Sequence, residues 1–169
     1  MIQIYTGNGK GKTTAALGLA LRAAGHGMKV IMIQFMKGKI DYGELTAARH
    51  LPNFTIEQYG RPDFVDPASP DEEDIRLARK GFARAKTVVM SREYDIVILD
   101  EMNVAVDYGL IKTGDVIALF EEKPKKVALV LTGRYMPEAF VPYADLITEC
   151  RELKHYFNRG VKAQKGFEY

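Results

Sequence analysis

One stretch near the start of the chain decides the fold: Ile2-Gln-Ile-Tyr-Thr-Gly-Asn-Gly-Lys-Gly-Lys-Thr-Thr14. A short apolar strand leads into a glycine-rich turn, and the turn opens an alanine-rich helix. This is the arrangement of a P-loop, in which backbone N–H groups and a helix N-terminus surround phosphate groups. The usual pattern G-x-x-x-x-G-K-[ST] would begin at position 6, where this chain has Thr6, but Lys12 and Thr13 occupy their expected places. The stretch therefore predicts a nucleotide-binding loop.

A turn without a ligand is the alternative interpretation of the same residues. Glycine costs backbone entropy in a folded chain, and neighbouring lysines repel one another unless an anion lies between them. Here Gly7, Gly9 and Gly11 alternate with two lysines. We therefore favour the phosphate-binding interpretation.

Length and composition are those of a single-domain globular protein. We expect one domain over residues 1–169, since 47% of the residues are hydrophobic and 27% are charged. The net charge of +2 gives no basis for bulk binding to nucleic acid or to a membrane surface. Cys150 is the single cysteine, and we find neither a signal peptide nor an apolar run long enough to span a bilayer. We expect a cytoplasmic protein with no nucleic-acid or membrane partner.

The rest of the chain alternates between strand-like and helix-like segments. Apolar runs predict strands at 29–35, 55–59, 95–101, 126–133 and 145–151. Periodicity and capping signals predict helices at 12–25, 43–50, 71–92 and 113–122. Strands that are apolar along their whole length are typical of a parallel sheet covered on both faces. We predict an α/β fold, namely a RecA-like P-loop domain with three αβα layers and a mostly parallel central sheet.

Three further segments have features of their own. The helix at 12–25 is apolar almost all round, so we expect it to be buried on most sides. Residues 60–70 hold three prolines and predict an extended loop, and long ordered loops are often functional. The tail at 155–169 is basic and aromatic without clear periodicity.

A second functional signal is the strand that ends in Asp100-Glu101. In P-loop proteins a carboxylate at such a strand end binds Mg²⁺ directly or through water. The alternative is that the two acids only end the strand. Because the pair follows a P-loop at a suitable distance along the chain, we favour the metal-binding interpretation.

Two arginines have open interpretations from sequence alone. Arg134 follows a buried strand at its carboxyl end, where it could bind a terminal phosphate in bidentate fashion or lie on the surface. Arg22 is the one charge inside the helix at 12–25, and it could be solvated or reach a ligand across the loop. The residues themselves do not decide between these roles.

The chain resembles one family at four places. The matching pieces are Thr-Gly-Asn-Gly-Lys-Gly-Lys-Thr-Thr-Ala-Ala, Val-Ile-Leu-Asp-Glu-Met-Asn, Leu-Thr-Gly-Arg and Ala-Asp-Leu-Ile-Thr-Glu, with the closing run from Lys154 to Tyr169 as the most distinctive. On these motifs the chain is similar to the P-loop ATP:corrinoid adenosyltransferases. The resemblance covers nearly the whole chain, and the displaced first glycine is a feature of that family.

The resemblance implies a specific reaction. The 5′-deoxyadenosyl group of ATP passes to the cobalt(I) of a reduced corrinoid, and tripolyphosphate is released. Cobalt(I) is already a strong nucleophile, so the site needs no general base. It must place C5′ over cobalt and stabilise the charge that develops on the triphosphate.

The resemblance also implies residue roles. Nucleotide binding falls to Gly7, Asn8, Gly9, Lys10, Gly11, Lys12, Thr13, Thr14, Arg22 and Arg134. In these roles the glycines let the backbone approach closely, Lys10 and Arg134 add positive charge, and Asn8 contacts the ribose. The implied ligands of Mg²⁺ (or Mn²⁺) are Thr13 and Glu101, with Asp100 nearby. The implied catalytic residues are Lys12, Glu101, Arg134 and Phe64.

Phe64, in the proline-rich loop, is the candidate for blocking the lower face of the corrin. Removing the lower axial ligand makes cobalt(II) easier to reduce. The sequence departs from relatives that pair a phenylalanine with a tryptophan, since this chain has no Trp. The resemblance further implies a homodimer and a flavoprotein as electron donor.

Two other classes of function remain as alternatives at this stage. A nucleoside kinase of similar architecture would need a general base and an acceptor pocket. A RecA-like ATPase acting on nucleic acid would usually need a basic face, which the near-neutral charge does not favour.

Overall fold

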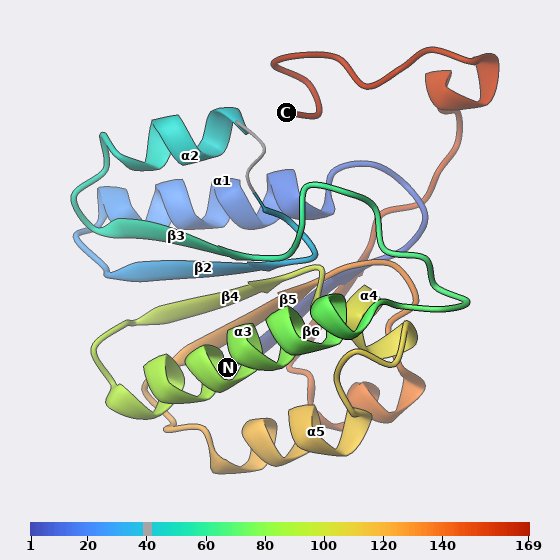
Figure 1. The fold of residues 1–169 in the computed structure, drawn as a ribbon. Helices are drawn as coiled ribbons and strands as arrows, with labels where there is room; N and C mark the ends of the chain where they lie inside the picture. Colours follow the sequence, from blue (N-terminus) through green and yellow to red (C-terminus); the bar gives the residue numbers. More distant parts are fainter. Residues whose placement is uncertain (39–41) are drawn as a thin grey trace.

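The protein is described here from a computed structural model, which covers residues 1–38 and 42–169. Its centre is a six-stranded sheet with the strand order β3-β2-β4-β5-β1-β6 (Figure 1). All the pairings between neighbouring strands are parallel. The strands are β1 (Ile2–Thr6), β2 (Val30–Phe35), β3 (Phe54–Tyr59), β4 (Ile96–Asp100), β5 (Ala128–Thr132) and β6 (Leu146–Glu149). The six predicted strands and the parallel sheet are thus confirmed.

Helices cover both faces of this sheet. One face carries α1 (Lys12–Gly25) and α2 (Gly43–Ala48), and the opposite face carries α3 (Glu72–Ser91), α4 (Met102–Asp107) and α5 (Thr113–Glu122) (Figure 1). The predicted α/β fold with three αβα layers is therefore confirmed. Short 3₁₀ helices at Glu138–Tyr143 and Tyr156–Arg159 and the helix α4 were not predicted, because each is too short to show a helical period.

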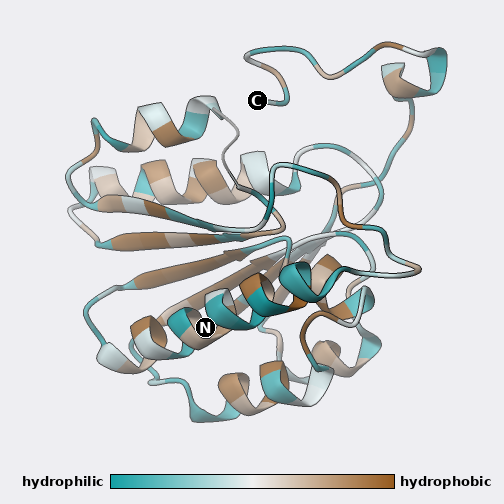
Figure 2. Cartoon of the chain, in the orientation of Figure 1, coloured by the Kyte–Doolittle hydropathy of each residue, from teal (hydrophilic) through white to brown (hydrophobic). Residues whose placement is uncertain are grey.

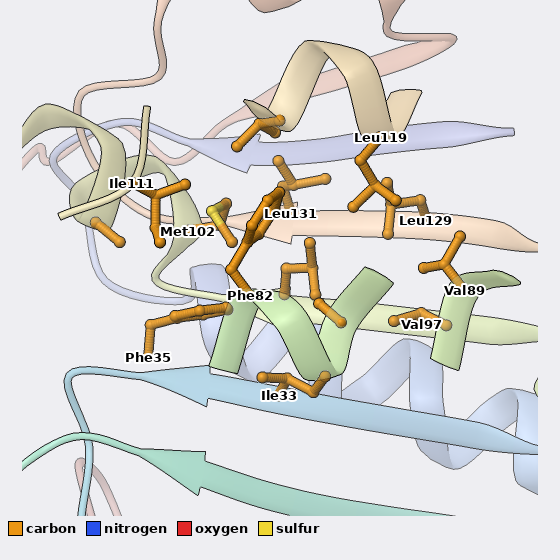
Figure 3. Close-up of a cluster of buried hydrophobic side chains, with 14 of the residues drawn as sticks. Ile33, Phe35, Phe82, Val89, Val97, Met102, Ile111, Leu119, Leu129 and Leu131 are labelled. Atoms are coloured by element: carbon orange, nitrogen blue, oxygen red, sulfur yellow. The ribbon is translucent and has the colours of Figure 1, made fainter. Parts of the chain in front are cut away.

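Alternation along the central strands divides the core between the two faces. In β2, Ile31, Ile33 and Phe35 pack toward α3 and α4, whereas Val30 and Met32 pack toward α1. This follows from the two-residue repeat of side-chain direction in a strand. The larger cluster, on the α3 side, is filled by branched and aromatic side chains (Figure 3). The strands are accordingly the most hydrophobic part of the chain (Figure 2).

The helix α1 differs from the expectation of burial on most sides. Its buried apolar residues are Ala16, Ala20 and Ala23, which face the sheet at helical spacing. Leu21 lies on the outer face and is 59% exposed. The alanines allow α1 to approach the sheet closely, so one narrow face is enough to hold the helix.

The parallel arrangement brings the sequence motifs together. The carboxyl ends of parallel strands lie at one edge of the sheet, which is where open α/β sheets bind their ligands. The P-loop follows β1, Lys37 follows β2, Asp100 ends β4 and Arg134 follows β5. Among the described residues, no helix is long and apolar enough to cross a membrane.

Two helical glycines give a matched test of packing. Gly18 in α1 has open space where a Cβ would lie, whereas a Cβ on Gly81 in α3 would lie 2.8 Å from Tyr59 Cβ and 3.1 Å from Phe35 Cε1. We expect Gly18→Ala to raise the free energy of unfolding by about 0.5–1 kcal/mol. We expect Gly81→Ala to lower it by about 1–3 kcal/mol through overpacking.

Urea unfolding of both variants with an unchanged m-value measures these effects. Equal effects of the two substitutions would contradict the close packing of α3 on β3 and β2.

Candidate functional site

The P-loop turns around the side chain of Lys12. Lys12 Nζ donates hydrogen bonds to the carbonyl oxygens of Gly7 and Gly9, each over 2.7 Å. Gly11 directly precedes α1 and has φ 117°, a conformation that favours glycine. Burial lowers the pKa of Lys12, and the charge of Arg134 acts in the same direction. The loop thus holds a buried ammonium group at the start of a helix.

Two of the loop glycines are required by a neighbouring segment of chain. A Cβ on Gly7 would lie 2.5 Å from the carbonyl oxygen of Cys150, and one on Gly9 would lie 2.7 Å from the carbonyl carbon of Arg151. Gly9 N–H also donates to the Cys150 carbonyl oxygen over 2.6 Å. By contrast, a Cβ on Gly11 would meet nothing within 4 Å. The room at Gly7 and Gly9 is thus taken by the backbone after β6.

Asp100 is a fully buried carboxylate whose two oxygens each accept two hydrogen bonds. Asp100 Oδ1 accepts from Thr13 Oγ1 (2.8 Å) and Thr132 Oγ1 (2.7 Å). Oδ2 accepts from Lys37 Nζ (2.8 Å) and Gln34 Nε2 (3.2 Å). Burial opposes the charged form, but Lys37 and the hydroxyl donors hold the pKa of Asp100 below its usual range. Burial likewise opposes the charge on Lys37, yet Asp100 raises the pKa of Lys37 to about 12.

Glu101 has the opposite electrostatic character. Burial and the adjacent charge of Asp100 raise the pKa of Glu101. Its backbone has φ 63°, in the left-handed region, and its N–H donates to Thr132 Oγ1 over 3.0 Å. Its side chain faces a cavity that Asp100 does not line. The two neighbouring acids are thus distinct, one enclosed by protein donors and one open to a ligand.

Arg134 is exposed at the end of β5 and is positioned through its neighbour. Asn103 Nδ2 donates to the carbonyl oxygen of Gly133 over 2.9 Å in a buried contact. Gly133 has φ 132°, and a Cβ there would lie 3.0 Å from Asn103 Cβ. The start of α4 therefore determines where the chain that carries Arg134 leaves the sheet.

Unusual backbone conformations occur beside each of these functional positions. Met36, Glu101 and Tyr135 follow β2, β4 and the Gly133–Arg134 pair, and their φ values are 56°, 63° and 56°. Left-handed conformations in residues other than glycine are uncommon and concentrate at functional sites. Their presence at one edge of the sheet supports a ligand site there.

The cavity at this edge has a volume of about 560 Å³. Predicted site residues that line it are Gly9, Lys10, Gly11, Lys12, Thr13, Thr14, Glu101 and Arg134. Residues that the sequence did not assign to the site are Leu17, Lys37, Tyr42, Gly43, Glu44, His155, Gly166, Phe167, Glu168 and Tyr169. Positive side chains from three loops and the first turn of α1 thus face one cavity of a size suited to a nucleotide.

Five predicted residues do not line this cavity. Gly7 and Asp100 lie behind it, in the contacts described above, and Asn8 is exposed on the loop. Arg22 is exposed in the last turn of α1, about 15 Å along the helix from Lys12. Phe64 is fully exposed on the loop between β3 and α3. Roles for Arg22 and Phe64 stay predictions.

A comparison with known families agrees with this geometry. The family model described as ATP:corrinoid adenosyltransferase BtuR/CobO/CobP matches residues 1–169, which is the whole chain. The chain belongs to this family. It is an ATP:corrinoid adenosyltransferase, an enzyme that transfers the adenosyl group of ATP to a corrinoid.

Individual corrinoid adenosyltransferases are similar to this chain over its whole length and over most of their own length. The chain is 37% identical to the corrinoid adenosyltransferase of Escherichia coli, over 100% of this chain and 85% of that protein. It is 34% identical to the one of Pseudomonas aeruginosa, over 100% of this chain and 83% of that protein. It is 36% identical to the one of a Sinorhizobium species, over 100% of this chain and 80% of that protein.

The Lys37–Asp100 pair of this adenosyltransferase can be tested by substitution. We expect Lys37→Met to lower the free energy of unfolding by about 3–5 kcal/mol, because the fully buried Asp100 would lose its cation. The double variant Lys37→Met with Asp100→Asn should lose less than the single one, because it leaves no unpaired charge. Lys125→Met, at an exposed lysine, is the control and should stay within about 0.5 kcal/mol of the wild type.

Urea unfolding monitored by circular dichroism gives all three values. A single Lys37→Met variant as stable as the Lys125 control would contradict a buried ion pair.

Proposed function

We propose that the protein transfers the 5′-deoxyadenosyl group of ATP to the cobalt(I) of a corrinoid and releases tripolyphosphate. The observation that carries this proposal is the cavity itself, where Lys12, Lys37 and Arg134 face one space beside the P-loop. This charge distribution suits a polyphosphate that must leave as a unit. Family membership supplies the acceptor, a corrinoid.

The reaction balances without a protein base. Cobalt(I) donates an electron pair to C5′ of the ribose and becomes an alkyl cobalt(III) centre. The bond from C5′ to the α-phosphate oxygen breaks, and its electron pair leaves with the triphosphate. The contribution of Lys12 and Arg134 is to stabilise that developing negative charge with fixed positive groups.

Mg²⁺ suits the oxygen donors beside the P-loop. Glu101 faces the cavity and Thr13 lies beside it in the first turn of α1, and both offer the hard oxygen ligands that Mg²⁺ prefers. Because both oxygens of Asp100 already accept from protein donors, we assign Asp100 to orienting Thr13 and not to direct contact with the metal. When bound, the metal neutralises part of the triphosphate charge.

Three further features of the proposal come from the family resemblance. We propose that the protein acts in the cytoplasm as a homodimer. We also propose that a flavoprotein donates the electron that reduces the corrinoid from cobalt(II) to cobalt(I). Light scattering of the purified protein tests the dimer, and a molar mass near 19.0 kDa would contradict it.

Lys12→Ala tests the role of the P-loop. Wild-type protein with ATP, Mg²⁺ and chemically reduced corrinoid should give a light-sensitive cobalt–carbon product and tripolyphosphate. In Lys12→Ala we expect kcat/KM to fall by about 100-fold or more, because one fixed charge on the leaving group is lost. Near-normal turnover of Lys12→Ala would contradict that role.

The wild-type assay also separates the alternative activities. Formation of ADP and phosphate alone would indicate an ATP hydrolase. Phosphate transfer to a nucleoside without corrinoid would indicate a kinase, and salt-sensitive binding to DNA or RNA would indicate a nucleic-acid ATPase.

Phe64→Ala tests the proposed contact with the lower face of the corrin. The ring of Phe64 is fully exposed and thus free to pack on a bound ligand. We expect Phe64→Ala to slow the reaction that starts from cobalt(II) at least about tenfold more than the one that starts from cobalt(I). Phe64→Tyr keeps the ring and should restore most of the difference, whereas equal losses in the two assays would refute the role.

A further inference from the structure

The last residues of the chain form a self-contained turn. The N–H groups of Phe167 and Glu168 both donate to the carbonyl oxygen of Gln164, over 3.1 and 2.9 Å. Gly166 N–H donates to the carbonyl oxygen of Tyr169 over 2.7 Å, and Gln164 N–H donates to Glu168 Oε2 over 2.7 Å. Residues 164–169 therefore hold one another in a defined shape, and we call them the terminal turn.

Lys10 joins the terminal turn to the P-loop. Lys10 Nζ donates to the carbonyl oxygen of Phe167 over 2.5 Å and lies 3.7 Å from Glu168 Oε1. Within residues 1–38 and 42–169, Glu168 Oε1 is buried and accepts no hydrogen bond, so its ion pair with Lys10 is the contact that offsets its charge. The contact spans 157 positions of sequence.

Lys10 and Lys12 are directed to different partners, although they are two residues apart. Lys12 is 8% exposed and bonds to carbonyl groups inside the P-loop. Lys10 is exposed and bonds to the terminal turn. The loop therefore has one lysine directed inward and one directed to a separate segment of chain.

The terminal turn lines the same cavity as the P-loop. Gly166, Phe167, Glu168 and Tyr169 line it together with His155, and the tail runs back to end above the N-terminal end of α1 (Figure 1). The P-loop part of the cavity is cationic, whereas this part adds aromatic surface. Phe167 is 70% exposed and Tyr169 is 40% exposed, so both rings retain surface for a ligand.

We propose that the terminal turn is the wall on which the adenosine part of ATP packs, and that Lys10 is a positioning residue that holds this wall in place. Aromatic side chains beside a phosphate-binding loop suit a purine base, because the base can stack on an aromatic ring. This inference rests on the proposed function for the identity of the ligand. The family resemblance gives Lys10 a phosphate contact instead, and the two roles lead to different results with tripolyphosphate.

Calorimetric titration of the protein with MgATP and, separately, with magnesium tripolyphosphate tests the proposal without any corrinoid. For Lys10→Gln, Glu168→Gln and Phe167→Ala we expect the Kd for ATP to rise about tenfold. The Kd for tripolyphosphate should stay within about twofold of the wild type, because this ligand lacks the adenosine part. Lys162→Gln removes the same charge from an exposed residue outside the terminal turn and the cavity, and it should change neither value.

The pairing of Lys10 with Glu168 has its own control. The double variant Lys10→Gln with Glu168→Gln should bind ATP no more weakly than either single variant, because both substitutions break one tether. Amide hydrogen exchange at 164–169 should become faster in each of these variants.

Two results would overturn the proposal. One is an equal loss of ATP and tripolyphosphate binding in Lys10→Gln with no effect of Glu168→Gln, which would assign Lys10 to phosphate. The other is unchanged ATP binding in all three single variants. Failure of the wild-type protein to bind either ligand would instead refute the proposed function, so the two failures are distinguishable.

Discussion

A single buried carboxylate connects the parts of this protein that must act together. Asp100 ends β4, and its partners come from the start of α1, from β2, from Lys37 in the loop after β2, and from β5. A carboxylate without solvent is stable only when every oxygen is satisfied. The relative positions of four segments are therefore set by one charge, and the P-loop is held to the sheet through Thr13.

Asp100 and Glu101 have different surroundings because of the backbone φ angle of Glu101. Side chains on a continuous strand alternate between its two faces. The left-handed conformation of Glu101 ends that alternation, so that its carboxylate faces the cavity while α4 begins at Met102. The same conformation at Met36 and Tyr135 turns the chain sharply beside Lys37 and Arg134. Backbone strain at the edge of the sheet thus brings charges from separate strands to one cavity.

The sequence predicts the elements better than it predicts the site. Residues along β2 and β4 are buried throughout, so each strand appears as an uninterrupted apolar run. The P-loop and Asp100-Glu101 are local motifs, so the sequence alone is enough to propose them as site residues. The link from Lys37 to Asp100 depends on β2 lying beside β4, and local sequence does not encode strand order. The terminal turn was missed because its shape comes from its own hydrogen bonds and from Lys10, not from a periodic pattern.

The P-loop contacts the backbone at Cys150, which lies far from it in the sequence. This contact can form only after most of the domain has been synthesised. The N–H of Gly9 finds its acceptor only when residue 150 is in place, and β1 pairs with β5 and β6, which are made last among the strands. Contacts between such distant residues form late and slow the folding of a domain. A nascent chain that has not yet reached residue 150 already contains the P-loop. It lacks the carbonyl group of Cys150 that accepts a hydrogen bond from the loop. The P-loop therefore gains this backbone support only after β6 has been synthesised, when the other five strands already exist.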